Sequence, residues 1–162
     1  MPIATGAQVL AADINNLVKI VRKTADETVN NSAAVQNDDE LFFAMTANQV
    51  WTGELRLLGT SSATDADFRF VFTGPVGAVL QGQCIASEPA AGVLTYTHIE
   101  IITRQWQVQG AGANIVYIVV KFTVTNGANA GNLQLQWAQV TAKAADTKIL
   151  TNSCIIAHLI NP

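Results

Sequence analysis

Apolar and polar side chains alternate with a two-residue period in run after run along this chain. In the run from Asn114 to Thr125, the apolar positions of one parity are Val116, Ile118, Val120, Phe122 and Val124. The run from Asp67 to Thr73 alternates in the same way and places three phenylalanines on one face. Successive side chains of a strand point to opposite faces of a sheet, so this period predicts strands that bury one face.

Counting these runs gives about eight strands, each roughly 6–12 residues long, separated by glycine-rich and polar turns. One helix-like segment precedes them. A chain of 162 residues has the usual length of a single domain. The pattern therefore predicts a mainly β fold, an antiparallel two-sheet sandwich that is jelly-roll-like, with a short N-terminal arm and helix.

Two turns predict how neighbouring strands meet. The runs 114–125 and 132–140 flank an Asn-Gly turn, which predicts a β-hairpin. The shorter runs 40–45 and 49–58 are separated by three residues, which predicts a hairpin or a tight corner.

The N-terminal segment has a different period. Its apolar residues follow the i, i+4, i+7 spacing of one helical face and are Leu10, Ile14, Leu17, Val18 and Val21. A helix of about twelve residues is marginal alone, so these five residues are the candidate partner interface, docking on the sandwich or on a neighbouring subunit. Residues 1–22 are accordingly expected to be an arm and an amphipathic helix, and residues 23–162 the β-sandwich domain.

Basic residues are few, and three of them gather at the end of this expected helix. Lys19, Arg22 and Lys23 complement the helix dipole there, and we interpret them as a solvated helix end. The whole chain has a net charge of −3. A surface that binds nucleic acid carries a basic patch or stripe, so nucleic acid is not an expected partner.

Charged residues make up only 13% of the chain, while 49% of its residues are hydrophobic. A typical soluble domain has about 25% charged residues. No run of about 18 apolar residues is present, so no membrane span is expected. We infer that much of the surface is covered by other subunits. The alternative is a neutral surface built from Asn, Gln, Thr and Ser.

The cysteines and histidines do not follow the spacing of a known kind of site. Cys84 and Cys154 are too few for a zinc site and lie in apolar surroundings, so we expect small buried side chains, with a disulfide as the less favoured alternative. His98 and His158 lie within strand runs, without the pattern of a Ser-His-Asp triad or a nucleophile elbow. No catalytic or cofactor-binding residue is predicted, and the chain is expected not to be an enzyme.

A turn-rich acidic segment suggests calcium binding as one hypothesis. Its carboxylates are Asp26, Asp38, Asp39 and Glu40. They lack the alternate-oxygen spacing and the glycine of an EF-hand loop. Capping of turns is the favoured interpretation, and no metal site is predicted.

The stretch from Lys23 to Leu58 combines four short motifs. They are Lys-Thr-Ala-Asp-Glu-Thr-Val, then Ser32, then Gln-Asn-Asp-Asp-Glu-Leu, then Ala-Asn ahead of an aromatic-led strand. In this order they resemble a module of tailed-bacteriophage virion structural proteins. The resemblance implies a head decoration or tail-associated component of the phage particle, and it implies no particular binding site.

Low charge, one rigid domain and this resemblance favour a non-enzymatic capsid decoration or cement protein that stabilises the mature head. Its expected partners are copies of itself, as a homotrimer, and the phage major capsid protein. It would be made in the host cytoplasm and lie on the outer surface of the virion. The alternative is a tail-fibre or tail-tip module that recognises a host-surface glycan or protein, which predicts exposed aromatic side chains on end loops.

Overall fold

The computed structural model describes residues 17–87, 94–99, 105–110 and 112–161, and within these ranges its regular elements are all strands. The strands are β1 (Val18–Arg22), β2 (Glu27–Asn30), β3 (Gln36–Met45), β4 (Val50–Ser61), β5 (Phe68–Thr73), β6 (Val79–Ser87), β7 (Leu94–Ile99), β8 (Trp106–Val108), β9 (Val116–Thr125), β10 (Gly131–Gln139), β11 (Asp146–Ile149) and β12 (Cys154–Asn161). Each of the runs that alternate in the sequence overlaps one of these strands.

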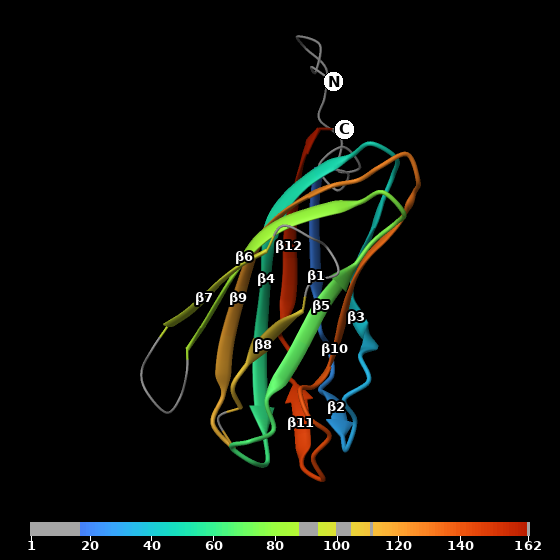
Figure 1. Ribbon diagram of the computed structural model, residues 1–162. Helices are drawn as coiled ribbons and strands as arrows, with labels where there is room; N and C mark the ends of the chain where they lie inside the picture. Colours follow the sequence, from blue (N-terminus) through green and yellow to red (C-terminus); the bar gives the residue numbers. More distant parts are fainter. Residues whose placement is uncertain (1–16, 88–93, 100–104, 111, 162) are drawn as a thin grey trace.

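The strands form two antiparallel sheets that lie as two layers (Figure 1). The larger sheet has the order β1-β12-β4-β9-β6-β7, and β11 joins it by pairing with both β2 and β4. The smaller sheet has the order β3-β10-β5-β8. The prediction of a mainly β, antiparallel two-sheet fold is confirmed.

The core lies between the sheets and is built from the alternating apolar positions. Phe72 of β5 packs on Phe122 of β9 across the two layers, with ring centroids 5.4 Å apart. Burying one phenylalanine completely contributes roughly 1.5–3 kcal/mol. The largest buried side chains include all three tryptophans, Trp51, Trp106 and Trp137.

The Asn-Gly turn does not close a hairpin, so that prediction is wrong. β9 pairs with β4 and β6 in the larger sheet, whereas β10 pairs with β3 and β5 in the smaller one. The chain crosses between the sheets at this turn. Asn126 fixes the crossing, because its Nδ2 atom donates to the carbonyl oxygens of Thr46 at 2.6 Å and Asn129 at 2.8 Å.

The turn between β3 and β4 is a second crossing, so the corner predicted there is confirmed and the hairpin is not. The two crossings touch, because the backbone N–H of Asn48 donates to the carbonyl oxygen of Gly127 at 2.8 Å. Asn48 has a φ of 62°, a left-handed conformation that asparagine tolerates better than most residues.

The expected helix is wrong over its described part, because Val18–Arg22 is strand β1. β1 pairs with β12 in the larger sheet, with Ile20 opposite Ile156. Three of its five residues are β-branched, and such side chains favour the pleated surface of a sheet over a helix. Leu10 and Ile14, which begin the expected helical face, lie outside the described residues.

The two cysteines lie far apart in the larger sheet and are free. Cys84 is on β6 and Cys154 on β12, with β4 and β9 between them. Three strand spacings amount to roughly 14 Å, about twice the Cα separation that a disulfide can bridge. Cys84 is buried as expected, and burial raises the pKa of its thiol to about 12, whereas Cys154 is only half-buried.

Candidate functional site

One face of the larger sheet is turned away from the smaller sheet. Along β4, β9 and β12, most residues of the inward parity are buried, whereas those of the other parity are exposed or half-buried. Outward residues on adjacent strands form cross-strand rows, and one row consists of Ile156, Glu54, Lys121 and Gln83. We refer to this surface as the outer face.

An open groove of about 600 Å³ lies on the outer face. Gly53 and Gly82 flank Phe122 in register, and all three residues contribute to the groove lining. The lining residues are Thr52, Gly53, Glu54, Arg56, Gln81, Gly82, Gln83, Lys121, Phe122, Thr123, Ile156 and His158. The volume is within the range of ligand sites, which is about 300–1,000 Å³.

Charges in the groove are paired with one another. Arg56 donates to Glu54 Oε2 from Nε at 3.0 Å and from Nη2 at 2.9 Å, and Lys121 Nζ lies 3.8 Å from Glu54 Oε1. The hydrogen bond to Glu54 raises the pKa of Arg56. The single Glu54 carboxylate offsets only one of the two positive charges, so the groove keeps one net positive charge beside the amides and hydroxyls that line it.

Apolar side chains flank the groove on the outer face. Ile20 on β1 is 72% exposed and lies opposite the half-buried Ile156 of β12. Tyr117 on β9 is 46% exposed and lies opposite Leu58 of β4. The outer face therefore combines exposed apolar residues with a central groove that holds the Glu54 ion pairs and neutral hydrogen-bonding groups.

Of the residues predicted as the partner interface, the three within the described segments, Leu17, Val18 and Val21, do not form one continuous face. Leu17 is exposed, Val18 is half-buried, and Val21 is half-buried and packs against the core. Val18 and Val21 differ in parity, so they lie on opposite faces of β1. Ile20, which sequence reasoning left out, is the most exposed apolar residue of this strand.

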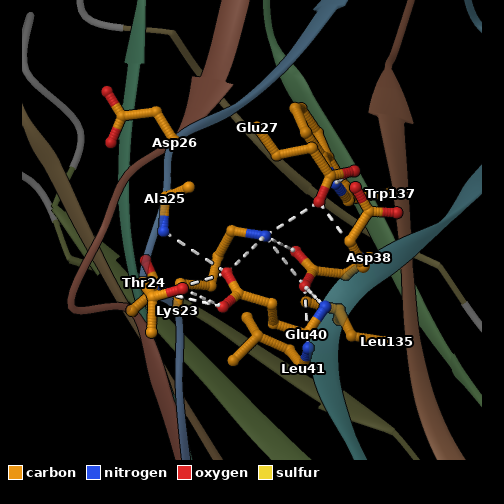
Figure 2. A network of polar contacts seen from close by, with 12 residues as sticks. Lys23, Thr24, Ala25, Asp26, Glu27, Asp38, Glu40, Leu41, Leu135 and Trp137 are labelled. Atoms are coloured by element: carbon orange, nitrogen blue, oxygen red, sulfur yellow. Dashed lines mark hydrogen bonds and ion pairs between the residues drawn. The ribbon is translucent and has the colours of Figure 1, made fainter.

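A second candidate site is a cluster of charges around Lys23, at the side of the sandwich where β1, β2 and β3 meet (Figure 2). Lys23 Nζ lies 2.8 Å from Glu27 Oε2 and 3.0 Å from each carboxylate oxygen of Asp38. It lies 4.0 Å from Glu40 Oε2. Only 1% of Lys23 and 1% of Asp38 is exposed.

Backbone and indole N–H groups fix the carboxylates of this cluster. Asp38 Oδ1 accepts from the backbone N–H of Glu40 at 3.0 Å and of Leu41 at 2.8 Å. Glu27 Oε1 accepts from Trp137 Nε1 at 2.9 Å. Asp38 therefore caps backbone groups within its own strand β3, whereas the prediction for the acidic segment was capping of turns.

The two buried carboxyl groups have opposite tendencies to ionise. Burial raises the pKa of Asp38, and this outweighs the hydrogen bonds that the carboxylate accepts. Burial also acts to raise the pKa of Glu27, but hydrogen bonds from Lys23 and from the Asp39 backbone outweigh it, so the pKa is lowered. Burial acts to lower the pKa of Lys23, and hydrogen bonds to Glu27 and Asp38 raise it overall.

The interpretation of Lys23 as part of a solvated helix end is wrong. In a strand, Lys23 continues the inward parity of Lys19 and Val21, so its side chain enters the sandwich instead of solvent. A signal was present in the sequence, because several carboxylates follow Lys23 within the acidic segment. Their convergence on one ammonium depends on the pairing of distant strands, which local patterns do not encode.

Among the described residues, no group of three or more His, Cys, Asp or Glu side chains is arranged to hold a metal ion. Asp26 caps a turn, because its Oδ1 atom accepts from the backbone N–H of Thr151 at 2.8 Å. No helix of the described segments is long and apolar enough to cross a membrane.

No protein-family model and no curated protein sequence matches this chain. Among solved structures, it is similar to a chain of the infectious bursal disease virus Gt strain, with 8% identity, a TM-score of 0.22, and coverage of 90% of this chain and 42% of that chain. A chain of the Gx strain of the same virus matches with 8% identity, a TM-score of 0.19, and coverage of 86% and 39%. The protein spans less than half the length of these chains, and such low TM-scores carry no functional conclusion.

Proposed function

We propose that this protein is a non-enzymatic structural component of a tailed-phage particle, a decoration or cement subunit that stabilises the mature head. The observation that carries the proposal is the outer face of the larger sheet, where Ile20 and Tyr117 stand exposed beside a groove whose charges are already paired. Exposed apolar residues on a rigid, weakly charged surface are typical of a surface that another protein covers.

The expected partners are copies of the same chain, as a homotrimer, and the major capsid protein of the phage. The resemblance of Lys23–Leu58 to a phage virion module supports this assignment, as does the low content of charged residues, 13%. A cement subunit acts by mass action, because a protein that binds the assembled shell and not its separated parts shifts the equilibrium toward the intact shell. Its place would be the outer surface of the virion.

Co-sedimentation of the purified protein with phage heads tests the proposal. Ile20→Asp places a charge on the outer face and is expected to reduce occupancy on the heads at least tenfold. Phe42→Asp is the matched control, because Phe42 is an exposed apolar residue on β3 of the other sheet. Equal occupancy of wild type and Ile20→Asp, or no binding of wild type to heads, would contradict the proposal.

A tail-fibre or tail-tip module that binds a host-surface glycan is the second candidate. It is favoured by the amides of Gln81 and Gln83 and by the hydroxyls of Thr52 and Thr123 in the groove, because such groups can form hydrogen bonds with sugar hydroxyls. Glycan-array binding that Gln83→Ala abolishes, together with labelling of tails in virion images, would favour this function over head decoration.

A further inference from the structure

The Lys23 cluster brings an amine and a carboxyl group into reacting distance. Nζ of Lys23 is 3.0 Å from both Oδ1 and Oδ2 of Asp38. Equal distances to both oxygens place Nζ at most about 3.4 Å from the carboxyl carbon between them, within the 3–3.5 Å expected for a near-attack arrangement. The same two contacts also describe an ion pair, and attack on the carboxyl carbon needs Nζ to move from the side of the two oxygens to the face of the carboxyl group.

We propose that Lys23 and Asp38 form an intramolecular isopeptide bond, with Glu27 as the residue that transfers protons. The bond joins Nζ of Lys23 to Cγ of Asp38 and releases one water molecule. Residue 23 directly follows β1 of the larger sheet and residue 38 belongs to β3 of the smaller sheet, so the bond would tie the two layers together at one side of the sandwich. This inference goes beyond the proposed function and does not depend on it.

Glu27 is placed to take the proton that the amine must lose. Its Oε2 atom accepts from Lys23 Nζ at 2.8 Å. Removing one proton from the ammonium gives the neutral amine, whose lone pair attacks Cγ of the protonated Asp38 carboxyl group. The raised pKa of Asp38 favours its neutral acid form and the lowered pKa of Glu27 keeps that group ionised, whereas the raised pKa of Lys23 opposes the loss of its proton.

Two backbone N–H groups are aimed at the oxygen that gains charge during the attack. Both Glu40 N and Leu41 N donate to Oδ1 of Asp38, at 3.0 and 2.8 Å, and would stabilise the tetrahedral oxyanion. Oδ2 is then the leaving oxygen and departs as water, taking a proton from the nitrogen through Glu27. Overall, the Lys23 ammonium, the Asp38 carboxylic acid and the Glu27 carboxylate become an amide, a water molecule and a protonated Glu27.

Burial supports the reaction in two ways. Lys23 and Asp38 are almost completely shielded, and a positioned pair of reactants can reach effective concentrations of about 10⁵–10⁸ M. Water, the reactant of the reverse hydrolysis, is largely excluded. The reaction also removes the charges of the Lys23 ammonium and the Glu27 carboxylate, and with them the desolvation penalty of that ion pair.

Mass spectrometry of the intact, unfolded protein tests the proposal directly. Purified wild type is expected to be lighter than its sequence mass by one water molecule, and Lys23→Arg and Asp38→Ala are expected to have their full sequence masses. Glu27→Gln is expected to be folded and unreacted, or to react at least tenfold more slowly. Lys148→Arg, which changes a half-exposed lysine on β11, is the matched control and should lose water as wild type does.

Peptide mapping locates the bond. Digestion with trypsin and a glutamate-specific protease is expected to leave residues 23–27 joined to residues 28–40, with no cleavage after Lys23. A folded wild type of full sequence mass that is cleaved after Lys23 would overturn the proposal. So would a water loss that persists in Lys23→Arg. If Lys23→Arg fails to fold, the wild-type peptide map alone decides.

Discussion

The indole N–H of Trp137 on β10 donates to Oε1 of Glu27 on β2 at 2.9 Å. This contact joins a central strand of the smaller sheet to a peripheral strand of the larger one. The same carboxylate binds Lys23 through its other oxygen, so Trp137 orients the group that faces the lysine. One aromatic side chain therefore contributes both to the core and to the buried polar cluster.

Trp137→Phe should lower the free energy of unfolding by about 1–3 kcal/mol, because it removes a hydrogen bond to a charged acceptor and leaves a smaller ring in the core. Trp51→Phe is the comparison, since Trp51 is equally buried and its Nε1 donates to the neutral amide oxygen of Gln49 at 3.1 Å. We expect the loss of unfolding free energy, measured by urea denaturation, to be larger for Trp137→Phe than for Trp51→Phe. Equal losses would show that the charged acceptor adds nothing.

Gln139 is buried and satisfies its whole side-chain amide. Its Oε1 atom accepts from the backbone N–H groups of Ser32 and Lys143, and its Nε2 atom donates to the carbonyl of Ala145 and to Thr147 Oγ1. These four bonds tie the end of β10 to Ser32, to the loop after β10 and to β11. A buried polar network stabilises the fold only when each of its groups has a hydrogen-bond partner.

Gln139→Leu should therefore cost at least about 2 kcal/mol of unfolding free energy, because three part-buried backbone groups and the buried Thr147 hydroxyl lose their partner together. Gln136→Leu on the same strand is the matched control, since its Nε2 atom makes one solvent-exposed bond, to Asn37 Oδ1 at 2.8 Å. We expect its effect to stay within about 0.5 kcal/mol. If Gln139→Leu lost no more unfolding free energy than Gln136→Leu, water would be replacing the Gln139 amide without penalty.

Local patterns predicted the strands and their inward faces because both depend on neighbouring residues alone. Leu133, Leu135 and Trp137 alternate in the sequence, and all three are buried in the structure. The Asn-Gly turn at residue 126 marks a reversal of the chain, but the identity of the sheet that receives the next strand is decided by distant partners. For that reason the turn was predicted correctly and the pairing was not.

The N-terminal segment shows the limit of periodicity over a short run. Val18 and Val21 fit a helical face, and the β-branched content that favours a strand was outweighed by the spacing of residues further upstream. The prediction that Lys23 lies in solvent depended on the expected helix, because a residue at a helix end is solvated. At an inward-facing position of a strand, the same side chain is buried. The carboxylates that compensate its burial come from β2 and β3, and only the folded topology brings them together.

Hydrogen bonds to the Glu40 carboxylate are expected to make the stability of the folded protein fall at acid pH. Its carboxylate accepts from Thr24 Oγ1 at 2.5 Å and from the Thr24 backbone N–H at 2.9 Å, and these hydrogen bonds lower the pKa of Glu40 in the folded protein. A carboxyl group whose folded pKa is depressed contributes stability above its unfolded pKa, about 4.3, and loses that contribution as the pH falls through the folded value.

Glu40→Gln should accordingly be less stable than wild type at pH 7, and the difference should shrink as the pH falls from about 4.5 toward 2, because the wild type alone loses the carboxylate contribution. The measurement is the midpoint of thermal unfolding by circular dichroism across this range. The donors belong to Thr24, so the expectation holds whether or not Lys23 is bonded to Asp38. A difference between the two proteins that stays constant from pH 7 to pH 2 would rule out Glu40 as a source of the acid sensitivity.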